Sequence, residues 1–489
     1  MWPAVMSVII DVGLLSGRTV SLEVGLGASV RTLRRQAQAA LAVNKGRLFD
    51  STGAVLHEQA TVQEAKLQSG DSLTLQIMTV QLCSSLSAFA AILIDGSVAT
   101  WGTGATGGDS TAVQDQLKNV QEIQSSDYAF AAILSNGSVV TWGRADCGGD
   151  SSAVQDQLEN VHEIQASSSA FAAILGNGSV VTWGNAAFGG DSSAVHDQLK
   201  DVRQIQANSS SFAAVLGDAS VVTWGDAHNG GDSSTVQDQL ENVQQIQANS
   251  KAFAAILENG SVVTWGNAGF GGDSRAVQHQ LRNVQHIQAS SRAFAAILAD
   301  GSVVTWGTAT HGGDSSTVQH QLVNVKQIQA SGYAFAAILS GGAVVTWGEA
   351  SGGGDSSDVQ EQLKNVRHIQ ASELAFAATL CDGSLVTWGD TGYSAGDSGA
   401  VREQLMNVQQ VQACQGSFAA ILDDGCVVTW GDANNGGNSS AVRDQLRNVQ
   451  QIQCSTWAFA AVLADGSVVS WGCQYYGGDS TAVSDRLRA

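Results

Sequence analysis

Apolar and polar residues follow one another along most of this chain in a pattern that repeats about every 41 residues. One copy reads VQQIQA at 243–248, FAAIL at 253–257, an Asn-Gly pair, and SVVTWG at 261–266. These three runs, rich in β-branched and aromatic residues, predict three strands of a small antiparallel sheet. The Asn-Gly or Asp-Gly pair predicts a two-residue hairpin turn. The fourth copy has Asp218-Ala219 there, and because Ala is strained at positive φ, we predict another turn type for it.

Two aromatic positions recur in every copy. A Trp ends the third predicted strand, and successive Trp residues are 41 apart except for one step of 42: Trp101, Trp142, Trp183, Trp224, Trp265, Trp306, Trp347, Trp388, Trp430 and Trp471. A Phe precedes each by twelve residues: Phe89, Phe130, Phe171, Phe212, Phe253, Phe294, Phe335, Phe376, Phe418 and Phe459. One three-stranded sheet cannot bury both rings, so we predict that adjacent copies stack with the rings between them. The predicted fold is an all-β, propeller-like repeat domain of ten 41-residue blades, either a closed ring or an open array.

The segment that links successive copies carries a repeated acidic residue. One example reads GGDSTAVQDQLKNV at 107–120, and its Val and Leu, four apart, predict one or two helical turns or a short edge strand. The Asp could belong to a ring of calcium ligands or could cap the following turn, and Asp-Ser favours the cap. The Asp residues are Asp109, Asp150, Asp191, Asp232, Asp273, Asp314, Asp355, Asp397 and Asp479, and Asn438 takes the place in the ninth copy.

The stretch NVQQIQANSKAFAAILENGSVVTWGNAGFGGDS at 242–274 resembles the repeat of the regulator of chromosome condensation family. That repeat has a V-x-x-I/V-x-A strand, an A-L strand, D-G-x-V, W-G and G-Q-L-G. The resemblance covers 79–489 and implies β-propeller blades. This chain departs from the family in two ways: Ala or Ser replaces the usual His before the A-L strand, and ten copies exceed the usual seven blades.

Residues 1–78 do not repeat, and their pattern predicts a small α+β domain. Ser29 is predicted to cap a helix whose apolar positions are Val30, Leu33, Ala37 and Leu41. The other predicted elements are a hairpin of 7–12 and 19–24, short strands at 46–49 and 54–56, a capped turn at 61–67 and a last strand at 71–78.

This order is that of a β-grasp domain, and the pattern resembles ubiquitin-like domains. Conjugated ubiquitin-like proteins end in a free Gly-Gly, whereas here the last strand continues into MTVQLCSS at 78–85. The resemblance therefore implies an in-chain recognition module rather than a conjugated one.

Charge and cysteine content narrow the functional classes. The chain has a net charge of −21, with +1 on residues 1–78 and −22 on residues 79–489. Such acidity argues against nucleic acid or an anionic membrane as a direct partner. The seven Cys residues lack the spacing of a disulfide framework or a zinc site, which favours a reducing compartment, cytoplasm or nucleus. No apolar run reaches the roughly 20 residues of a membrane helix, and no HExxH or phosphate-loop motif indicates an enzyme. We therefore expect no catalytic residue, no metal and no cofactor.

The alternating strand directions place the variable segments on one face. The loops before each Phe and after each Trp-Gly emerge together, here called the loop face, and the Asp-Gly turns emerge on the opposite turn face. Sequence varies among copies on the loop face, at positions that include Tyr128, Lys251, Arg292 and Tyr333. Loops on rigid scaffolds carry binding residues, and aromatic residues are common anchors. The candidates for protein binding are Phe188, Phe270, Tyr393, Trp457, Tyr475 and Tyr476.

Three functions fit these observations. The first is a non-enzymatic scaffold whose propeller binds a protein while the ubiquitin-like domain links it to ubiquitin-pathway machinery. The second, implied by the resemblance, is a nucleotide-exchange regulator of a small GTPase. The third is a substrate-recognition fragment related to HECT-type ubiquitin ligases, whose catalytic region finds no room after repeats that run to about residue 482.

Overall fold

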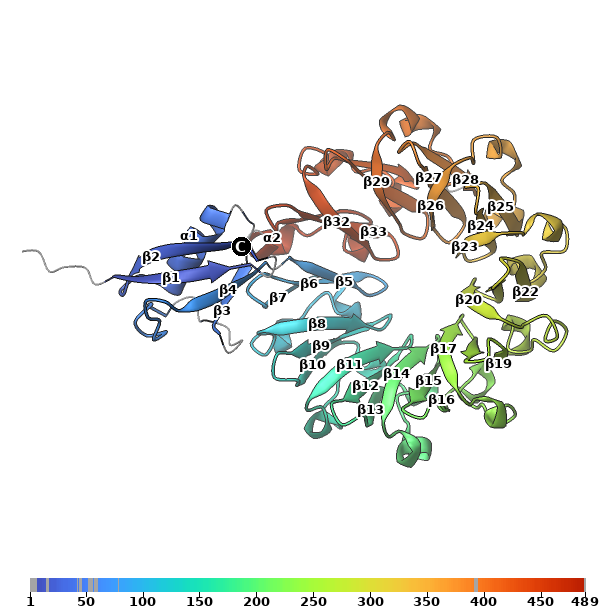
Figure 1. Cartoon of the computed structure of the whole chain (residues 1–489), viewed down its shortest axis with the longest axis horizontal. Coiled ribbons are helices and arrows are strands. Elements are labelled where there is room, and N and C mark those ends of the chain that lie inside the picture. The colour runs from blue at the N-terminus through green and yellow to red at the C-terminus, as the bar shows by residue number, and fades with distance from the viewer. Residues whose placement is uncertain are drawn as a thin grey trace, which may run out of the picture.

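The computed structural model describes residues 7–14, 17–41, 43, 46–51, 56, 60–77, 79–390 and 395–487. A four-stranded N-terminal sheet is followed by ten three-stranded sheets. These ten sheets succeed one another around a ring with a central opening, and the N-terminal sheet lies outside the ring beside the first and last blades (Figure 1). The predicted strand at 54–56 falls mostly on residues outside the described part.

The N-terminal sheet has the predicted β-grasp order. In chain order, the elements of this N-terminal domain are β1 (Ser7–Gly13), β2 (Thr19–Gly25), α1 (Val30–Leu41), β3 (Gly46–Phe49) and β4 (Ser72–Ile77). The strands lie in the order β2-β1-β4-β3, with β1 parallel to β4 and the other pairs antiparallel. Ser29 Oγ accepts the Thr32 N–H at 3.2 Å, which confirms the predicted helix cap. All four predicted apolar positions of α1 are buried in the core of this sheet.

Each blade is one copy of the repeat, and its three strands are antiparallel in chain order. The strands of blades 1 to 10 are β5 (Gln81–Ser84), β6 (Ala88–Ile92), β7 (Val98–Gly102); β8 (Val120–Ser125), β9 (Ala129–Leu134), β10 (Val139–Gly143); β11 (Val161–Ala166), β12 (Ala170–Leu175), β13 (Val180–Gly184); β14 (Val202–Ala207), β15 (Ser211–Leu216), β16 (Val221–Gly225); β17 (Val243–Ala248), β18 (Ala252–Leu257), β19 (Val262–Gly266); β20 (Val284–Ala289), β21 (Ala293–Leu298), β22 (Val303–Gly307); β23 (Val325–Ala330), β24 (Ala334–Leu339), β25 (Val344–Gly348); β26 (Val366–Ala371), β27 (Ala375–Leu380), β28 (Leu385–Gly389); β29 (Val408–Ala413), β30 (Ser417–Leu422), β31 (Val427–Gly431); and β32 (Val449–Cys454), β33 (Ala458–Leu463), β34 (Val468–Gly472).

The hairpin turns differ from the two-residue turns that the sequence predicts. Leu298 N–H donates to Ser302 O at 2.9 Å, and Gly301 N–H donates to Leu298 O at 2.9 Å. The loop therefore has three residues, and only its Gly lies at positive φ, at 77° for Gly301. This is a tight turn followed by a residue in the left-handed region. Asp300 stabilises it, because its side chain accepts the Ser302 N–H.

The prediction of another turn type in the fourth blade is wrong. Ala219 has φ 65°, in the same region as the Gly of the other turns. Asp218 Oδ1 accepts the Ser220 N–H at 3.0 Å, and Ala219 O accepts the Val243 N–H of the next blade at 2.9 Å. These bonds hold the backbone in place, so the alanine carries the strain rather than changing the turn.

Neighbouring blades pack large side chains of one against small side chains of the other. In blade 3, Phe171 and Trp183 stack with ring centroids 5.2 Å apart. The pair packs in one cluster with Ala129, Ala131 and Ile133 of blade 2. All ten Phe residues are fully buried, and the ten Trp residues are 2% to 4% exposed. The prediction that both rings fill the space between blades is confirmed.

A hydrogen bond and a close glycine contact complete each junction. Trp183 Nε1 donates to Gly148 O of the preceding blade at 3.0 Å. Gly148 has φ 95°, and a Cβ there would lie 2.4 Å from Phe171 Cδ2. This position therefore requires glycine for its backbone conformation and for its closeness to the next blade's Phe.

The junction between blades 8 and 9 lacks this arrangement. Ala395 stands where the other blades have that glycine, after the one inserted residue of the repeat, and it is buried beside Phe418 and Trp430. Trp430 Nε1 has no hydrogen-bond partner among the described residues, although it is as buried as the other Trp residues.

Blade 10 packs against blade 1 and closes the ring. Trp101 Nε1 donates to Gly477 O at 3.0 Å, which repeats the junction across the two ends of the array. The C-terminal helix α2 (Ser484–Leu487) places Leu487 in one cluster with Phe89 and Trp101. The first strands of neighbouring blades contact one another around the whole ring, including β32 with β5, and they border the central opening (Figure 1). Of the closed ring and the open array, the chain adopts the closed ring.

The linking segments form 3-10 turns or single turns, and the capping interpretation of their acidic residue is confirmed. Asp109 Oδ1 accepts the Thr111 N–H at 2.9 Å, and this hydrogen bond lowers the pKa of Asp109. Asn438 accepts the Ser440 N–H at 2.9 Å in the same way.

Candidate protein-binding surface

The loop face is built from two variable segments in each blade that are tied together. In blade 5, the Asn267 side chain accepts the Gly269 N–H and begins the 3-10 turn η9 (Ala268–Phe270). Asn249, which opens the loop before the second strand, donates from Nδ2 to Phe270 O at 2.6 Å. Ser290 Oγ bonds His311 O in the same way in blade 6, at 2.8 Å. The variable side chains thus stand on fixed backbone.

A belt of backbone hydrogen bonds joins the blades at this face. At eight of the ten blade junctions, the middle residue of the loop between the first and second strands donates to its counterpart in the next blade, as in Asp127 N–H to Ser168 O at 3.1 Å. The donors are Leu86, Asp127, Ser168, Ser209, Ser291, Gly332, Gln415 and Thr456. The last of these donates to Leu86 O at 3.1 Å and joins blade 10 to blade 1, whereas the described residues show no such bond from blade 5 to blade 6 or from blade 8 to blade 9. Because these bonds cross the junctions between blades, they fix the loop face of each bonded blade relative to its neighbour.

Cations and aromatic rings alternate across blades 5 to 7. Lys251 Nζ lies 5.3 Å from the centroid of the Phe270 ring, and Arg292 Cζ lies 4.9 Å from the same centroid. The His311 and Tyr333 rings follow, with centroids 4.7 Å apart. Burial, and secondly the charge of Arg292, lower the pKa of His311, so its ring is neutral at pH 7.

A second group of side chains runs across blades 8 to 10. Trp457 and Tyr476 lie with ring centroids 4.3 Å apart. Trp457 Nε1 donates to Gln415 Oε1 at 2.8 Å, and Gln415 Nε2 in turn donates to Glu373 Oε2. Tyr475, beside this pair, is 77% exposed. The chain of contacts orients the Trp457 indole while leaving the neighbouring Tyr475 ring open to a partner.

The predicted site residues therefore do not form one cluster. Trp457, Tyr475 and Tyr476 come together in blade 10, whereas Phe270 lies between two cations on blades 5 and 6. Phe188, Phe270 and Tyr476 are each half-buried and pack against the core of a blade junction. Tyr393 lies outside the described residues.

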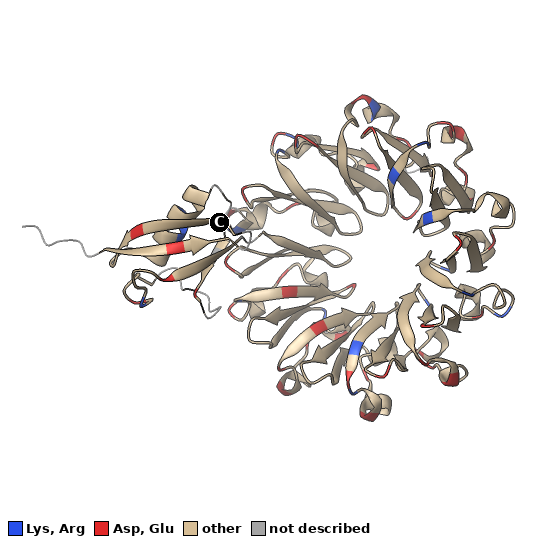
Figure 2. Cartoon of the chain, in the orientation of Figure 1, with Lys and Arg blue, Asp and Glu red and all other residues tan. Residues whose placement is uncertain are grey.

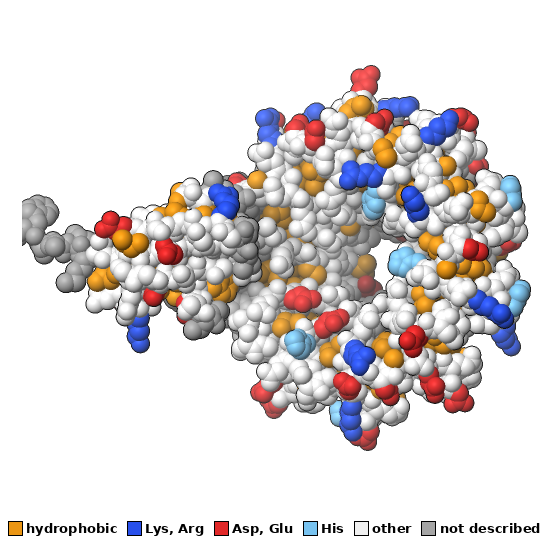
Figure 3. Space-filling view, in the orientation of Figure 1, with side chains coloured by type: hydrophobic (Ala, Val, Ile, Leu, Met, Phe, Trp, Pro, Cys, Tyr) orange, Lys and Arg blue, Asp and Glu red, His pale blue; other side chains and the backbone are white. Residues whose placement is uncertain are grey.

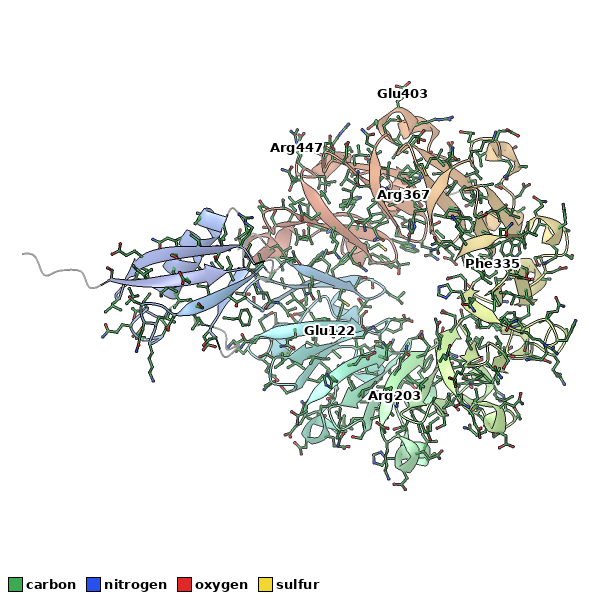
Figure 4. The ribbon with its side chains drawn as sticks, in the orientation of Figure 1. Glu122, Arg203, Phe335, Arg367, Glu403 and Arg447 are labelled. Atoms are coloured by element: carbon green, nitrogen blue, oxygen red, sulfur yellow. The ribbon has the colours of Figure 1, made fainter. Side chains whose placement is uncertain are left out.

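The strands that border the central opening carry charge unevenly. Glu122 and Glu163 are on β8 and β11, and Arg203, Lys326 and Arg367 are on β14, β23 and β26 (Figures 2 and 4). Burial, and secondly the charge of Glu163, raise the pKa of Glu122. The space-filling view shows charged side chains of both signs scattered around the ring and a hollow at its centre (Figure 3).

The described residues contain no group of three or more His, Cys, Asp or Glu placed to hold a metal ion. No helix in the described part of the chain is long and apolar enough to cross a membrane.

Comparisons with known proteins point to two folds. No family model and no curated protein sequence matches the chain. Yeast RCC1 (Prp20), solved with Kap60 bound, is similar over 78% of this chain and 89% of its own, with 16% identity and a TM-score of 0.36. The chain resembles RCC1-type propellers. The designed protein Ika8 is similar over 64% of this chain and 96% of its own, with 13% identity and a TM-score of 0.30. Ubiquitin of Caldiarchaeum subterraneum is similar over 15% of this chain and 98% of its own, with 24% identity and a TM-score of 0.15.

The fold is established by the strand pairing within this chain. The ten repeated sheets form a propeller-like ring, and the N-terminal sheet with its helix forms a β-grasp-like domain before it.

Sequence reasoning treated the variable positions one at a time and missed their pairing. The pattern marks Lys251 and Arg292 as variable positions, but it does not show that both lie beside Phe270 or that Gln415 contacts Trp457. The available signal is spacing: Trp457 and Tyr476 are 19 residues apart, as are Lys251 and Phe270, and both pairs are in contact. Positions with this separation meet on the loop face of one blade.

Proposed function

We propose that this chain is a non-enzymatic protein-interaction scaffold acting in the cytoplasm or nucleus. The loop face of the propeller, residues 79–489, binds a protein partner, and the ubiquitin-like domain, residues 1–78, links it to ubiquitin-pathway machinery. The observation that supports this most is the aromatic group Trp457, Tyr475 and Tyr476 on a face whose blades are joined by a backbone belt. Exposed aromatic residues on a rigid support are common anchors of protein interfaces.

Two further observations agree with this proposal. All seven Cys residues are free thiols, as expected in a reducing compartment. The second observation concerns the surface of the N-terminal domain. On the N-terminal sheet, Ile9 is 53% exposed and gives a partner an apolar contact point. The experiment compares proteins captured from cells by the full chain and by single variants of it.

The variant Tyr475→Ser is expected to reduce capture of the propeller's partner. Val323→Ser is the matched control, because Val323 is also exposed, at 53%, but lies in a linking segment. Ile9→Glu is expected to remove ubiquitin-pathway proteins while leaving the propeller's partner bound. An unchanged list of captured proteins with Ile9→Glu contradicts the linking role, and an equal loss with Tyr475→Ser and Val323→Ser contradicts the loop face as the binding surface.

A further inference from the structure

Two cations of the loop face have an aromatic partner but no acidic one. Lys251 and Arg292 are both exposed and lie on the Phe270 ring at 5.3 and 4.9 Å. Among the described residues, neither side chain takes part in an ion pair or a side-chain hydrogen bond. The ring holds the two charges in place, since a cation over an aromatic face is attracted to it.

On another blade, a cation that lies over an aromatic ring also has an acidic partner. Arg144 lies 5.5 Å from the Tyr128 ring centroid, also on the loop face. Its guanidinium forms an ion pair with Asp146 at 2.7 Å, so its charge is neutralised within the chain. The charges on blades 5 and 6 remain available for an anion from outside.

The surroundings extend this site rather than neutralise it. The His311 and Tyr333 rings continue the row beyond Arg292. The charge of Glu349 acts to raise the pKa of His311, but Glu349 forms no ion pair with Arg292 among the described residues. The row therefore offers two positive charges separated by an aromatic face, with a second aromatic pair at one end.

We propose that Lys251, Phe270 and Arg292 bind an acidic segment of a protein partner. The inference rests on the proposed function, because it specifies the chemistry of the partner that the loop face accepts. Carboxylates of the segment bind the Lys251 ammonium and the Arg292 guanidinium, which suits bidentate contact with a carboxylate. Apolar parts of the segment pack on the exposed edges of the rings.

The charge of the whole chain favours a short acidic peptide over nucleic acid. Residues 79–489 carry a net charge of −22. An extended polyanion with a charge on every nucleotide is repelled by this surface, and nucleic-acid binding needs many neutralising cations. Two cations suffice for a few carboxylates at short range, where screening by salt limits the repulsion from distant charges.

The test measures fluorescence anisotropy of a labelled peptide with six consecutive Glu residues on addition of the full chain in about 0.15 M salt, which screens charges more than about 8 Å away. The same peptide with Gln in place of Glu is the ligand control. Arg292→Glu is compared with Arg447→Glu, which makes the same charge change at the outer edge of the ring, where the Arg447 side chain is 71% exposed (Figure 4). Both variants lie at the surface, and their circular dichroism spectra and melting temperatures are required to match those of the unaltered chain.

The expected result is binding of the Glu peptide and not of the Gln peptide. Arg292→Glu weakens binding by about tenfold or more, since a hydrogen bond to a charged group contributes on that scale. Arg447→Glu changes the affinity by less than about twofold, as expected of a distant exposed charge. Equal losses with the two variants, no binding by the unaltered chain, or tighter binding of a single-stranded RNA of equal length each overturn the proposal.

Failure here is distinguishable from failure of the proposed function. If the peptide does not bind but Tyr475→Ser still reduces capture of the cellular partner, only the acidic-segment site is wrong. If neither effect is seen, the loop face is not a protein-binding surface.

Discussion

Replacing Trp347 and Trp430 separately with Phe measures what the indole hydrogen bond contributes to a blade junction. The two sites are matched in packing: Trp347 is 3% exposed and Trp430 is 4% exposed. Their ring centroids lie 5.3 and 5.2 Å from the partner Phe, at interplanar angles of 17° and 11°. They differ in hydrogen bonding, because Trp347 Nε1 donates to Gly312 O at 3.0 Å whereas Trp430 Nε1 has no partner among the described residues, and Ala395 takes the place of that glycine beside Trp430.

The expected magnitudes follow from this difference. Both substitutions lose similar packing when an indole becomes a phenyl ring. Trp347→Phe also leaves Gly312 O without its donor, which costs about 1–3 kcal/mol for a buried polar group. Trp430→Phe instead removes a buried donor that is already unpaired, and so recovers a desolvation cost of similar size. We expect Trp347→Phe to lower the free energy of unfolding by about 2 kcal/mol or more beyond the loss caused by Trp430→Phe.

The assay is urea unfolding of the full chain followed by circular dichroism in the strand region, with the slope of the transition required to agree among the three proteins. An equal loss of stability in the two variants contradicts the reasoning, since it shows that the indole hydrogen bond contributes nothing at the junction. A greater loss with Trp430→Phe contradicts the assignment of Trp430 as the unpaired indole.

Three other predictions concern single positions. Ala219→Gly is expected to stabilise the chain by about 0.5 kcal/mol or more, because it relieves positive φ at Ala219, whereas Gly301→Ala is expected to cost more than about 1 kcal/mol; thermal melting checks both. Ser470→Thr is expected to add about 1 kcal/mol in the same assay, because Ser470 Oγ is unpaired whereas Thr in the equivalent place bonds a Ser in other blades. Burial raises the pKa of Cys454 from 9.0 to about 12. As pH rises, the thiol is therefore deprotonated in the unfolded chain before it is deprotonated in the folded chain. Its ionisation does not change the free energy of unfolding below pH 9, and it lowers that free energy as pH rises above 9. At a pH near 9, mass spectrometry after alkylation is expected to show modification of exposed Cys381 and not of Cys454, and equal modification of the two contradicts the buried thiol.

The repeat unit could be predicted because its determinants are local or recur at a fixed spacing. The Phe and Trp positions, the cap by Asp109 and the helix cap by Ser29 all follow from residue type and separation. Closure into a ring could not be read from one copy, because it depends on the small rotation between adjacent sheets, and that rotation is set by how the Phe and Trp rings sit on the alanines of the preceding blade.

The turn at Ala219 and the grouping on the loop face could not be predicted from one copy of the repeat, because both depend on contacts between blades. Ala219 keeps the common turn because contacts from the neighbouring blade outweigh its local preference. The position of Phe270 between Lys251 and Arg292 joins two blades, and the pattern within one copy does not contain it. Aromatic residues on variable loops indicate candidate positions on the loop face, whereas the grouping of these residues depends on how the loops fold against one another.

The central claim is that ten blades, each pressed against the next through its Phe and Trp rings, close into a single ring. Electron microscopy of the purified full chain, averaged over particles viewed along the ring axis, tests it most directly. The account predicts a continuous ring of ten spokes around a central opening, with one additional density outside the ring for the N-terminal domain. An arc with a gap between the first and last blades, or a smaller ring with the remaining repeats trailing from it, contradicts the account.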